Sequence, residues 1–225
     1  VDPRVRRITV RDLLRMASGF AVDESLERAW HDSPHWVRFT LQRRLAHPPG
    51  QVFRYDTQAV HLLSAILATA TKTDTEEFAN RRLFGPLGID RPAWPADPQG
   101  NPNGGFGLML NLRDMAKLGQ LYLDQGRWNG RQLIPADYVQ ASTRPQGQAG
   151  LPLKEDEGIS YGYLWWVTRS KGHPAYFAQG YGGQFVYVVP ALGLVVAIAS
   201  TQDGEHIENR RIVARFVVPA VRAGG

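Results

Sequence analysis

The 225-residue chain contains no cysteine. This absence excludes a disulfide scaffold, a thiol nucleophile, a thiolate zinc site and a cysteine-held iron–sulfur cluster. An uninterrupted run of about 18 apolar residues is also missing, so we expect no membrane span. The six histidines form no His-Glu-x-x-His motif and no His-x-x-x-His pair on one helix. We therefore predict no metal site and no other cofactor.

The chain also lacks a large excess of positive or negative charge. Lys and Arg number 26 against 21 Asp and Glu, which leaves a net charge of +5 that is spread along the chain. A mild, dispersed excess of this kind is poor evidence for nucleic-acid binding, and we expect none. With 43% hydrophobic and 21% charged residues, the chain can bury a sizeable core, which rules out wholesale disorder.

The first part of the chain carries helical patterns. A capping box at Thr9–Asp12 opens a helix, because the threonine hydroxyl can accept from a first-turn amide while the aspartate reaches back. Gly19 is expected to be its left-handed C-cap. Further helices are expected over residues 36–45, 58–70, 75–83 and 111–126. The helix at 58–70 is apolar on nearly every side, which predicts that it is buried.

The hydrophobic period changes near residue 160. Short β-branched and aromatic runs, separated by turn residues, predict sequential antiparallel strands. These runs are 161–167, 185–189 and 194–199, and a closing helix is expected over 205–218. Helices first and a hairpin sheet last predict an α+β fold, in which helices cover an antiparallel sheet beside a mostly helical subdomain. Within one domain spanning 1–225, we expect residues 1–143 to form the mostly helical part and residues 158–225 the sheet strands and closing helix.

Three clusters carry candidate chemistry. They are Pro49–Thr57 before the helix expected to be buried, Gly104–Leu108 in a loop rich in proline and glycine, and Gly180–Gln184 before a strand. With Ile8–Leu14 at the front, their order and spacing resemble the serine β-lactamase and penicillin-binding-protein family. The most similar branch comprises class C β-lactamases, related esterases, D-amino-acid peptidases and 6-aminohexanoate-oligomer hydrolases. The resemblance runs from about Ile8 to about Ser200. It implies a β-lactamase/transpeptidase-like fold and an acyl-enzyme reaction on a small-molecule amide or ester.

The resemblance also implies site residues. The family uses a Ser-x-x-Lys nucleophile, a Tyr-x-Asn motif and a Lys-Thr-Gly or His/Trp-x-Gly strand. Tyr55 and Thr57 fall on the second motif, with threonine in place of asparagine. This match implies that Tyr55 is the general base and acid and that Thr57 is a substrate contact.

Tyr181-Gly182-Gly183 falls on the third family motif, with Tyr181 in place of the basic or aromatic residue. The match implies that these three residues contact the substrate and that the backbone amide of Gln184 is one of two oxyanion donors. A tyrosine lacks the charge of a lysine, so we do not expect avid recognition of β-lactam carboxylates. Paired glycines let a substrate carbonyl reach main-chain amides. The alternative is structural: small residues at a strand entry simply let backbones approach closely.

The chemistry of Tyr55 can be weighed without the family. A free phenol titrates near pH 10, so a base near neutrality needs a shift of about three pKa units, or roughly 4 kcal/mol. A helix N-terminus supplies about 0.3–1 kcal/mol, and a neighbouring cation must supply much of the rest. The structural alternative is a core tyrosine, with Asp56 or Thr57 as the helix cap.

The nucleophile motif is missing, because no serine of the chain has lysine three residues later. Ser25–Arg28 comes nearest, but arginine cannot shed its proton to activate a hydroxyl. In the family, Ser-x-x-Lys precedes the segment matched by Ile8–Ser18. We therefore expect a C-terminal portion of a hydrolase domain, inactive alone, whose sheet lacks strands and is exposed along one edge. The alternative is a non-catalytic descendant that binds a peptide or protein partner, and the changes at Thr57 and Tyr181 favour it.

Overall fold

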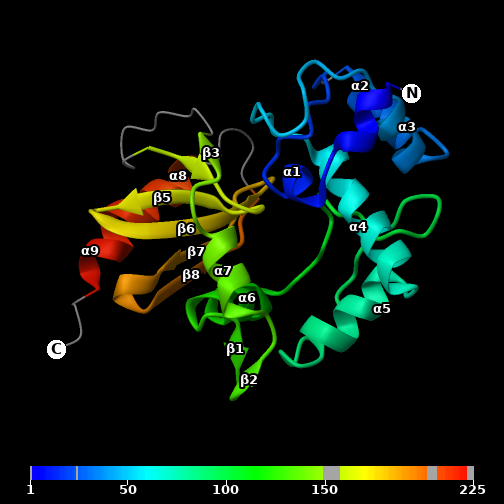
Figure 1. Cartoon of the computed structure of the whole chain (residues 1–225). Helices are drawn as coiled ribbons and strands as arrows, with labels where there is room; N and C mark the ends of the chain where they lie inside the picture. Colours follow the sequence, from blue (N-terminus) through cyan, green and yellow to red (C-terminus); the bar gives the residue numbers. More distant parts are fainter. Residues whose placement is uncertain (1, 24, 149–157, 202–206, 222–225) are drawn as a thin grey trace. The chain divides into compact units, whose positions relative to one another are not determined.

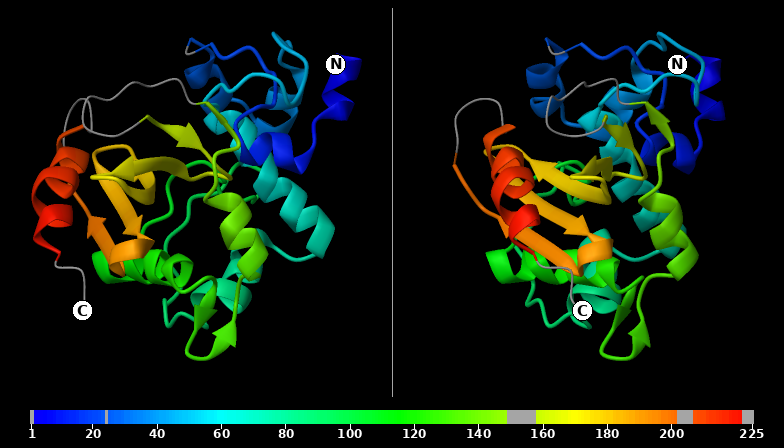
Figure 2. Two further views of the ribbon diagram at one scale, coloured as in Figure 1. Left: turned by 60° about the vertical axis from the view of Figure 1, so that its left-hand side comes forward. Right: turned by 90° about the vertical axis from the view of Figure 1, so that its left-hand side faces the viewer.

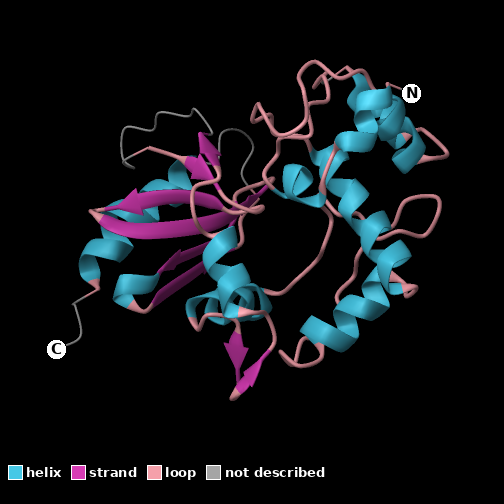
Figure 3. Ribbon diagram, viewed as in Figure 1, coloured by secondary structure: helices cyan, strands magenta, loops and turns pink. Residues whose placement is uncertain are grey.

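The computed structural model describes residues 2–23, 25–148, 158–201 and 207–221. The chain divides into two compact units, Val1–Met109 and Leu110–Gly225. Helices and loops make up the first unit, whereas the second holds the large sheet and the helices that cover it (Figures 1 and 3). This arrangement confirms the α+β class.

Helices of the first unit are short except for one. They are η1 Pro3–Arg7, α1 Val10–Leu14, α2 Leu26–His31, α3 Trp36–Gln42, α4 Thr57–Thr71, α5 Thr75–Ala79 and the π-helical turn η2 Asn80–Phe84. Thr9 and Asp12 form the predicted capping box at the start of α1. The core joins α1 and α4 through side chains that include Leu13, Phe20 and Leu62. Only the first half of α4 is buried, so the prediction of a wholly buried helix was too strong.

Gly19 does not cap α1, which ends five residues earlier, at Leu14. Met16 takes the left-handed conformation there, with φ of 56°. The φ of Gly19 is also positive, at 86°, but its role is close approach: a Cβ at this position would lie 2.4 Å from the carbonyl oxygen of His47. The carbonyl oxygen of Gly19 accepts from the amides of Ala46 and His47, which ties two distant loops together.

The second unit contains a six-stranded antiparallel sheet in the order β3-β4-β5-β6-β7-β8. Its strands are β3 Gly147–Gln148, β4 Ser160–Tyr161, β5 Trp166–Ser170, β6 His173–Gly180, β7 Gln184–Val189 and β8 Leu194–Ile198, with the 3-10 turn η3 Pro190–Leu192 before β8. The other elements are α6 Leu112–Leu123, the hairpin β1 Arg127–Trp128 and β2 Arg131–Gln132, α7 Ala136–Ser142, α8 Ile207–Ile212, η4 Val213–Val217 and α9 Val218–Ala220.

Alternate residues of β7 build two separate cores. Phe185, Tyr187 and Val189 share one buried cluster with Val213 and Val218 of the closing helices. The residues between them, Val186 and Val188, belong to a second cluster, against which Met115 and Tyr122 of α6 pack. Since side chains alternate along a strand, one strand can serve both faces. The sheet is therefore covered by helices on two sides, and Figure 2 shows α8 to α9 along one of them.

The predicted strand 161–167 is interrupted. β4 ends at Tyr161 and β5 begins at Trp166, and between them Leu164 has a positive φ of 59°. His173 and Pro174 are the first two residues of β6. Among the described residues, β8 pairs with β7 alone and so forms one end of the sheet. No helix within the described ranges has the length and apolar character needed to cross a membrane.

Candidate active site

Tyr55 lies directly before the long helix α4. Asp56 is the N-cap of this helix, because its carboxylate accepts from the Ala59 amide at 3.1 Å. Thr57 is the first helical residue, so the cap is the aspartate and not the threonine. The Tyr55 ring is 46% exposed, which excludes the alternative of a packed core tyrosine.

A buried ion pair fixes the backbone beside Tyr55. Nη1 of Arg43 donates to Oδ1 of Asp56 at 3.0 Å, and the two side chains are only 5% and 4% exposed. Nη2 of Arg43 donates to the carbonyl oxygen of Ala21 at 2.6 Å, while the guanidinium lies 5.2 Å from the centre of the Phe20 ring. These contacts fix the position of Asp56 and therefore of the adjacent backbone that carries the Tyr55 side chain.

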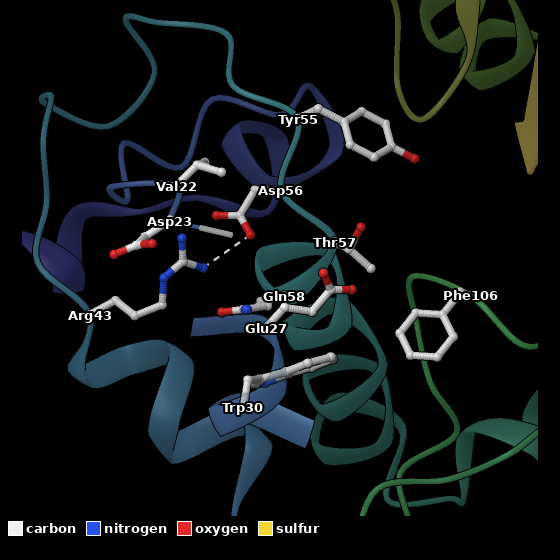
Figure 4. Close-up of a pocket in the computed structure, with 10 residues that line it drawn as sticks. All are labelled: Val22, Asp23, Glu27, Trp30, Arg43, Tyr55, Asp56, Thr57, Gln58 and Phe106. Carbon is white, nitrogen blue, oxygen red and sulfur yellow. Dashed lines mark hydrogen bonds and ion pairs between the residues drawn. The ribbon is translucent and has the colours of Figure 1, made fainter. Parts of the chain in front are cut away.

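A cavity of about 200 Å³ opens beside Tyr55 within the first unit (Figure 4). It combines three aromatic rings, three carboxylates, one guanidinium and small or polar side chains. The lining residues are Val22, Asp23, Glu27, Trp30, Arg43, Tyr55, Asp56, Thr57, Gln58 and Phe106. The structure thus brings Tyr55 and Thr57 to one cavity.

The electrostatics of Tyr55 oppose a base near neutrality. Partial burial raises the pKa of its phenol above the ordinary value, because a less hydrated environment disfavours the charged phenolate. At neutral pH the phenol therefore keeps its proton and can act as an acid or a hydrogen-bond donor. A downward shift of the pKa requires a positive charge nearby.

The loop that carries Phe106 is anchored by a buried histidine. Nε2 of His61 lies 3.0 Å from Oδ2 of Asp97, and the Gly104 amide donates to Nδ1 of His61 at 3.3 Å. Because Nδ1 accepts, Nε2 carries the proton and donates to the aspartate. His61 is fully buried, and both of its ring nitrogens have a hydrogen-bond partner.

The paired glycines Gly104 and Gly105, directly before Phe106, let the same loop pack closely against α4. A Cβ on Gly104 would lie 2.9 Å from the carbonyl oxygen of Val60, and one on Gly105 would lie 2.5 Å from Cγ2 of Thr57. Only glycine therefore lets this loop contact α4 so closely. The cluster is a structural turn that places Phe106 at the cavity.

Tyr181, Gly182, Gly183 and Gln184 lie together in the second unit, at the turn between β6 and β7. Tyr181 is 89% exposed, whereas both glycines are buried, with φ of 77° and 87°. These positive angles favour glycine.

Two polar side chains hold this glycine turn. The Ser200 hydroxyl lies 2.8 Å from the Gly182 carbonyl oxygen and 3.1 Å from that of Gly183. Nδ2 of Asn209 donates to the Gly183 oxygen at 2.8 Å. The side chain of Gln184 exchanges hydrogen bonds with the backbone of Ser200. The carbonyls are thus fixed from one side, which sets the orientation of the peptide units in the turn.

Several residues of these sites gave no signal in the sequence. Arg43 reaches its partner across 13 residues, and Ser200 and Asn209 hold a turn 17 and 26 residues away. No helical or strand period connects such pairs. Among the described residues, no group of three or more His, Asp or Glu side chains converges as metal ligands would.

An antiparallel sheet with helices on both faces, together with a mostly helical unit, is an α+β architecture. The β-lactamase family model matches residues 2–218, and the chain belongs to this family of serine β-lactamases and penicillin-binding proteins.

One curated relative and two solved structures are similar to this chain. Penicillin-binding protein 4 of Amycolatopsis lactamdurans is 25% identical over 228 residues, which cover 86% of this chain and 59% of that protein. A solved structure described as a 6-aminohexanoate-dimer hydrolase from Bacillus anthracis has a TM-score of 0.77 at 23% identity, covering 94% of this chain and 60% of that one. The octameric penicillin-binding protein homologue of Pyrococcus abyssi gives 0.76 at 16% identity, covering 94% and 56%. The chain spans 59% and 63% of the length of the curated relatives it matches.

Proposed function

We propose that this chain supplies the acid–base tyrosine and the oxyanion turn of a serine hydrolase that acts on a small-molecule amide or ester. In this reaction the serine hydroxyl attacks the acyl carbon and gives its proton to the lysine of the nucleophile motif. The bond from the acyl carbon to the leaving amine or alcohol breaks, the leaving group takes a proton from Tyr55, and the lysine restores that proton to the phenol. Water then attacks the acyl-enzyme; the serine oxygen takes a proton from Tyr55, the water returns one to the phenol, and the acid and the free serine are released. The Gln184 amide stabilises the oxyanion that develops in both steps.

The observation that carries the proposal is Tyr55 itself. It is a half-exposed phenol at a fixed helix N-terminus, beside a cavity of about 200 Å³, in a chain of the β-lactamase family. Its raised pKa keeps the phenol protonated at neutral pH, so that a proton is present for a leaving group. Thr57, Tyr181, Gly182 and Gly183 would contact the substrate.

The serine and the lysine that activates it are not among the residues of this chain, because none of its serines precedes lysine by three positions. We therefore propose that the 225-residue chain alone performs no acyl transfer. Incubation with a fluorescent penicillin and with a fluorophosphonate should leave no stoichiometric adduct by intact-protein mass spectrometry. An adduct on this chain would overturn that part of the proposal.

The coding sequence upstream of Val1 supplies the decisive test. If it encodes Ser-x-x-Lys, the longer product should form the acyl adduct, and Tyr55→Phe should slow its formation by about 10²- to 10⁴-fold, as loss of a general acid–base does. Tyr138→Phe is the matched control, because this tyrosine lies on α7 and outside the lining of the cavity. Equal rates for Tyr55→Phe and the unmodified protein would refute the role of the phenol.

A second candidate is a non-catalytic module that binds a peptide or protein partner. Two departures from the family motifs favour this candidate. Position 57 holds threonine where the family has asparagine, and position 181 holds tyrosine where the family has lysine, histidine or tryptophan. This candidate predicts that no Ser-x-x-Lys is encoded upstream and that no acyl adduct forms in any length of product.

A further inference from the structure

The cavity beside Tyr55 carries an excess of negative charge. Asp23, Glu27 and Asp56 line it against the single guanidinium of Arg43. Since Arg43 and Asp56 neutralise each other at 3.0 Å, the carboxylates of Asp23 and Glu27 set the sign. Hydrogen bonds from the hydroxyl and the amide of Ser25 hold the pKa of Asp23 below its ordinary value, so this carboxylate is ionised at neutral pH. The chain as a whole has a net charge of +5, so the negative charge at the cavity is opposite in sign to that of the whole chain.

Two buried oxygens in the lining have no hydrogen-bond donor among the described residues. They are Oε1 of Gln58 and Oδ2 of Asp56, on side chains of residues that are only 9% and 5% exposed. Nε of Arg43 is a buried donor in the same lining that also has no partner among the described residues, so the unpartnered acceptors outnumber the unpartnered donors by two to one. In Figure 4 both side chains extend from the N-terminal end of α4 toward Arg43. A buried acceptor without a donor costs free energy, so a ligand that brings N–H groups here would be stabilised.

The rest of the lining is aromatic. Trp30, Tyr55 and Phe106 border the cavity, and the Trp30 and Phe106 rings lie 6.3 Å apart in an edge-to-face arrangement. The faces of such rings attract organic cations. Acidic side chains, unmet acceptors and aromatic walls all favour a group that is positive and donates hydrogen bonds, and an ammonium has three donors and no acceptor.

A bare metal ion fits this cavity poorly. A metal ion needs several ligands that converge within about 2.0–2.6 Å of one point. Across the described parts of the chain, no three acidic or histidine side chains converge in this way. The carboxylates are instead distributed around a space of about 200 Å³, which suits a bulkier organic cation.

We propose that this cavity binds the primary ammonium group of an organic amine, and that the substrates of the hydrolase are amides or esters that carry such a group. The second half of this statement rests on the proposed function. The first half does not, because binding of an amine requires neither the serine nor acyl transfer.

The probe is benzylammonium chloride, with benzyl alcohol as its uncharged analogue of similar shape. Titration calorimetry on the 225-residue chain at pH 7 and low ionic strength should show saturable binding of benzylammonium, at least tenfold tighter than binding of the alcohol. Asp23→Asn and Glu27→Gln should each weaken binding about three- to fivefold, and together about tenfold, as expected for partly solvated ion pairs. Asp32→Asn makes the same change of charge on a side chain that is 71% exposed and outside the cavity, so it should leave the affinity unchanged.

Equal affinity for the amine and the alcohol would overturn the proposal. So would an equal loss of affinity in Asp32→Asn, which would indicate only the general field of the surface, or displacement of the amine by millimolar Mg²⁺, which would indicate an inorganic cation site. The two proposals fail separately. Amine binding without acylation of the longer product would refute the hydrolase proposal but leave the ammonium site intact. Acylation without amine binding would refute the ammonium site but leave the hydrolase proposal intact.

Discussion

Replacing Asp56 with alanine should destabilise the first unit strongly, because this carboxylate has two roles. It neutralises Arg43 in a site where both side chains are about 5% exposed, and it caps α4 through the Ala59 amide. Removing one partner of a buried ion pair costs about 3–5 kcal/mol, and losing an N-cap costs about 1 kcal/mol. We expect the lower part of the combined range, about 4–5 kcal/mol, because Arg43 keeps its bond to the Ala21 carbonyl.

Urea unfolding followed by circular dichroism at pH 7 measures this loss. Asp74→Ala is the control for the cap alone: Asp74 accepts from two first-turn amides of α5 but is exposed and pairs with no cation in the described structure, so it should cost about 1 kcal/mol. Asp56→Asn retains a cap oxygen and should fall between the two. If Asp56→Ala costs no more than Asp74→Ala, the buried pair contributes nothing and the reasoning fails. Should Asp56→Ala not fold, the difference between Asp56→Asn and Asp74→Ala decides.

Two other perturbations test the fold. Gly162→Ala should lower the melting temperature sharply, because its Cβ would lie 1.9 Å from the carbonyl oxygen of Ser142. At Gly147 the new Cβ would have no atom of the described residues within 4 Å, so Gly147→Ala should be neutral. Equal melting temperatures for the two variants would contradict this packing. Asp97 gives a pH effect: burial raises its pKa, but hydrogen bonds from Asn101, His61 and Gln99 outweigh burial and leave it lowered. A carboxyl with a depressed pKa stabilises the fold above about pH 4 and loses this contribution as pH falls, so urea unfolding between pH 6 and 3 should weaken more steeply in the unmodified protein than in Asp97→Asn, and parallel slopes would refute the assignment.

Local rules predicted most of the helices and the character of the sheet. The Thr9–Asp12 capping box, the helix opened by Asn111 and the alternation along β7 each depend on residues within a few positions of one another. Trp166, the first residue of β5, packs into one cluster of the sheet, and Trp165 directly before it packs into the other. These features agree with the structure because they depend on local interactions, which contacts between distant residues do not override here.

Tertiary contacts account for the failures. The segment expected to form a strand at 161–167 has strongly β-forming residues. The strand is nevertheless interrupted at Gly162, whose backbone lies close to the carbonyl oxygen of Ser142. This contact joins residues 20 positions apart, so no local pattern predicts it. Gly19 was assigned to a helix end because glycine is common there, but the backbone of His47 determines its place. The expected division into residues 1–143 and 158–225 remains a prediction.

The candidate site shows the same division between local and distant causes. Motif order placed Tyr55 at the N-terminus of α4 and the glycines at a strand turn, but it did not give the sign of the field around the phenol. A catalytic base requires a cation beside that oxygen, and burial instead raises its pKa. Arg43 cannot supply the charge freely, since Asp56 neutralises it. An ammonium bound in the cavity would favour the phenolate, so in this chain the capacity of Tyr55 to accept a proton would depend on what occupies the cavity.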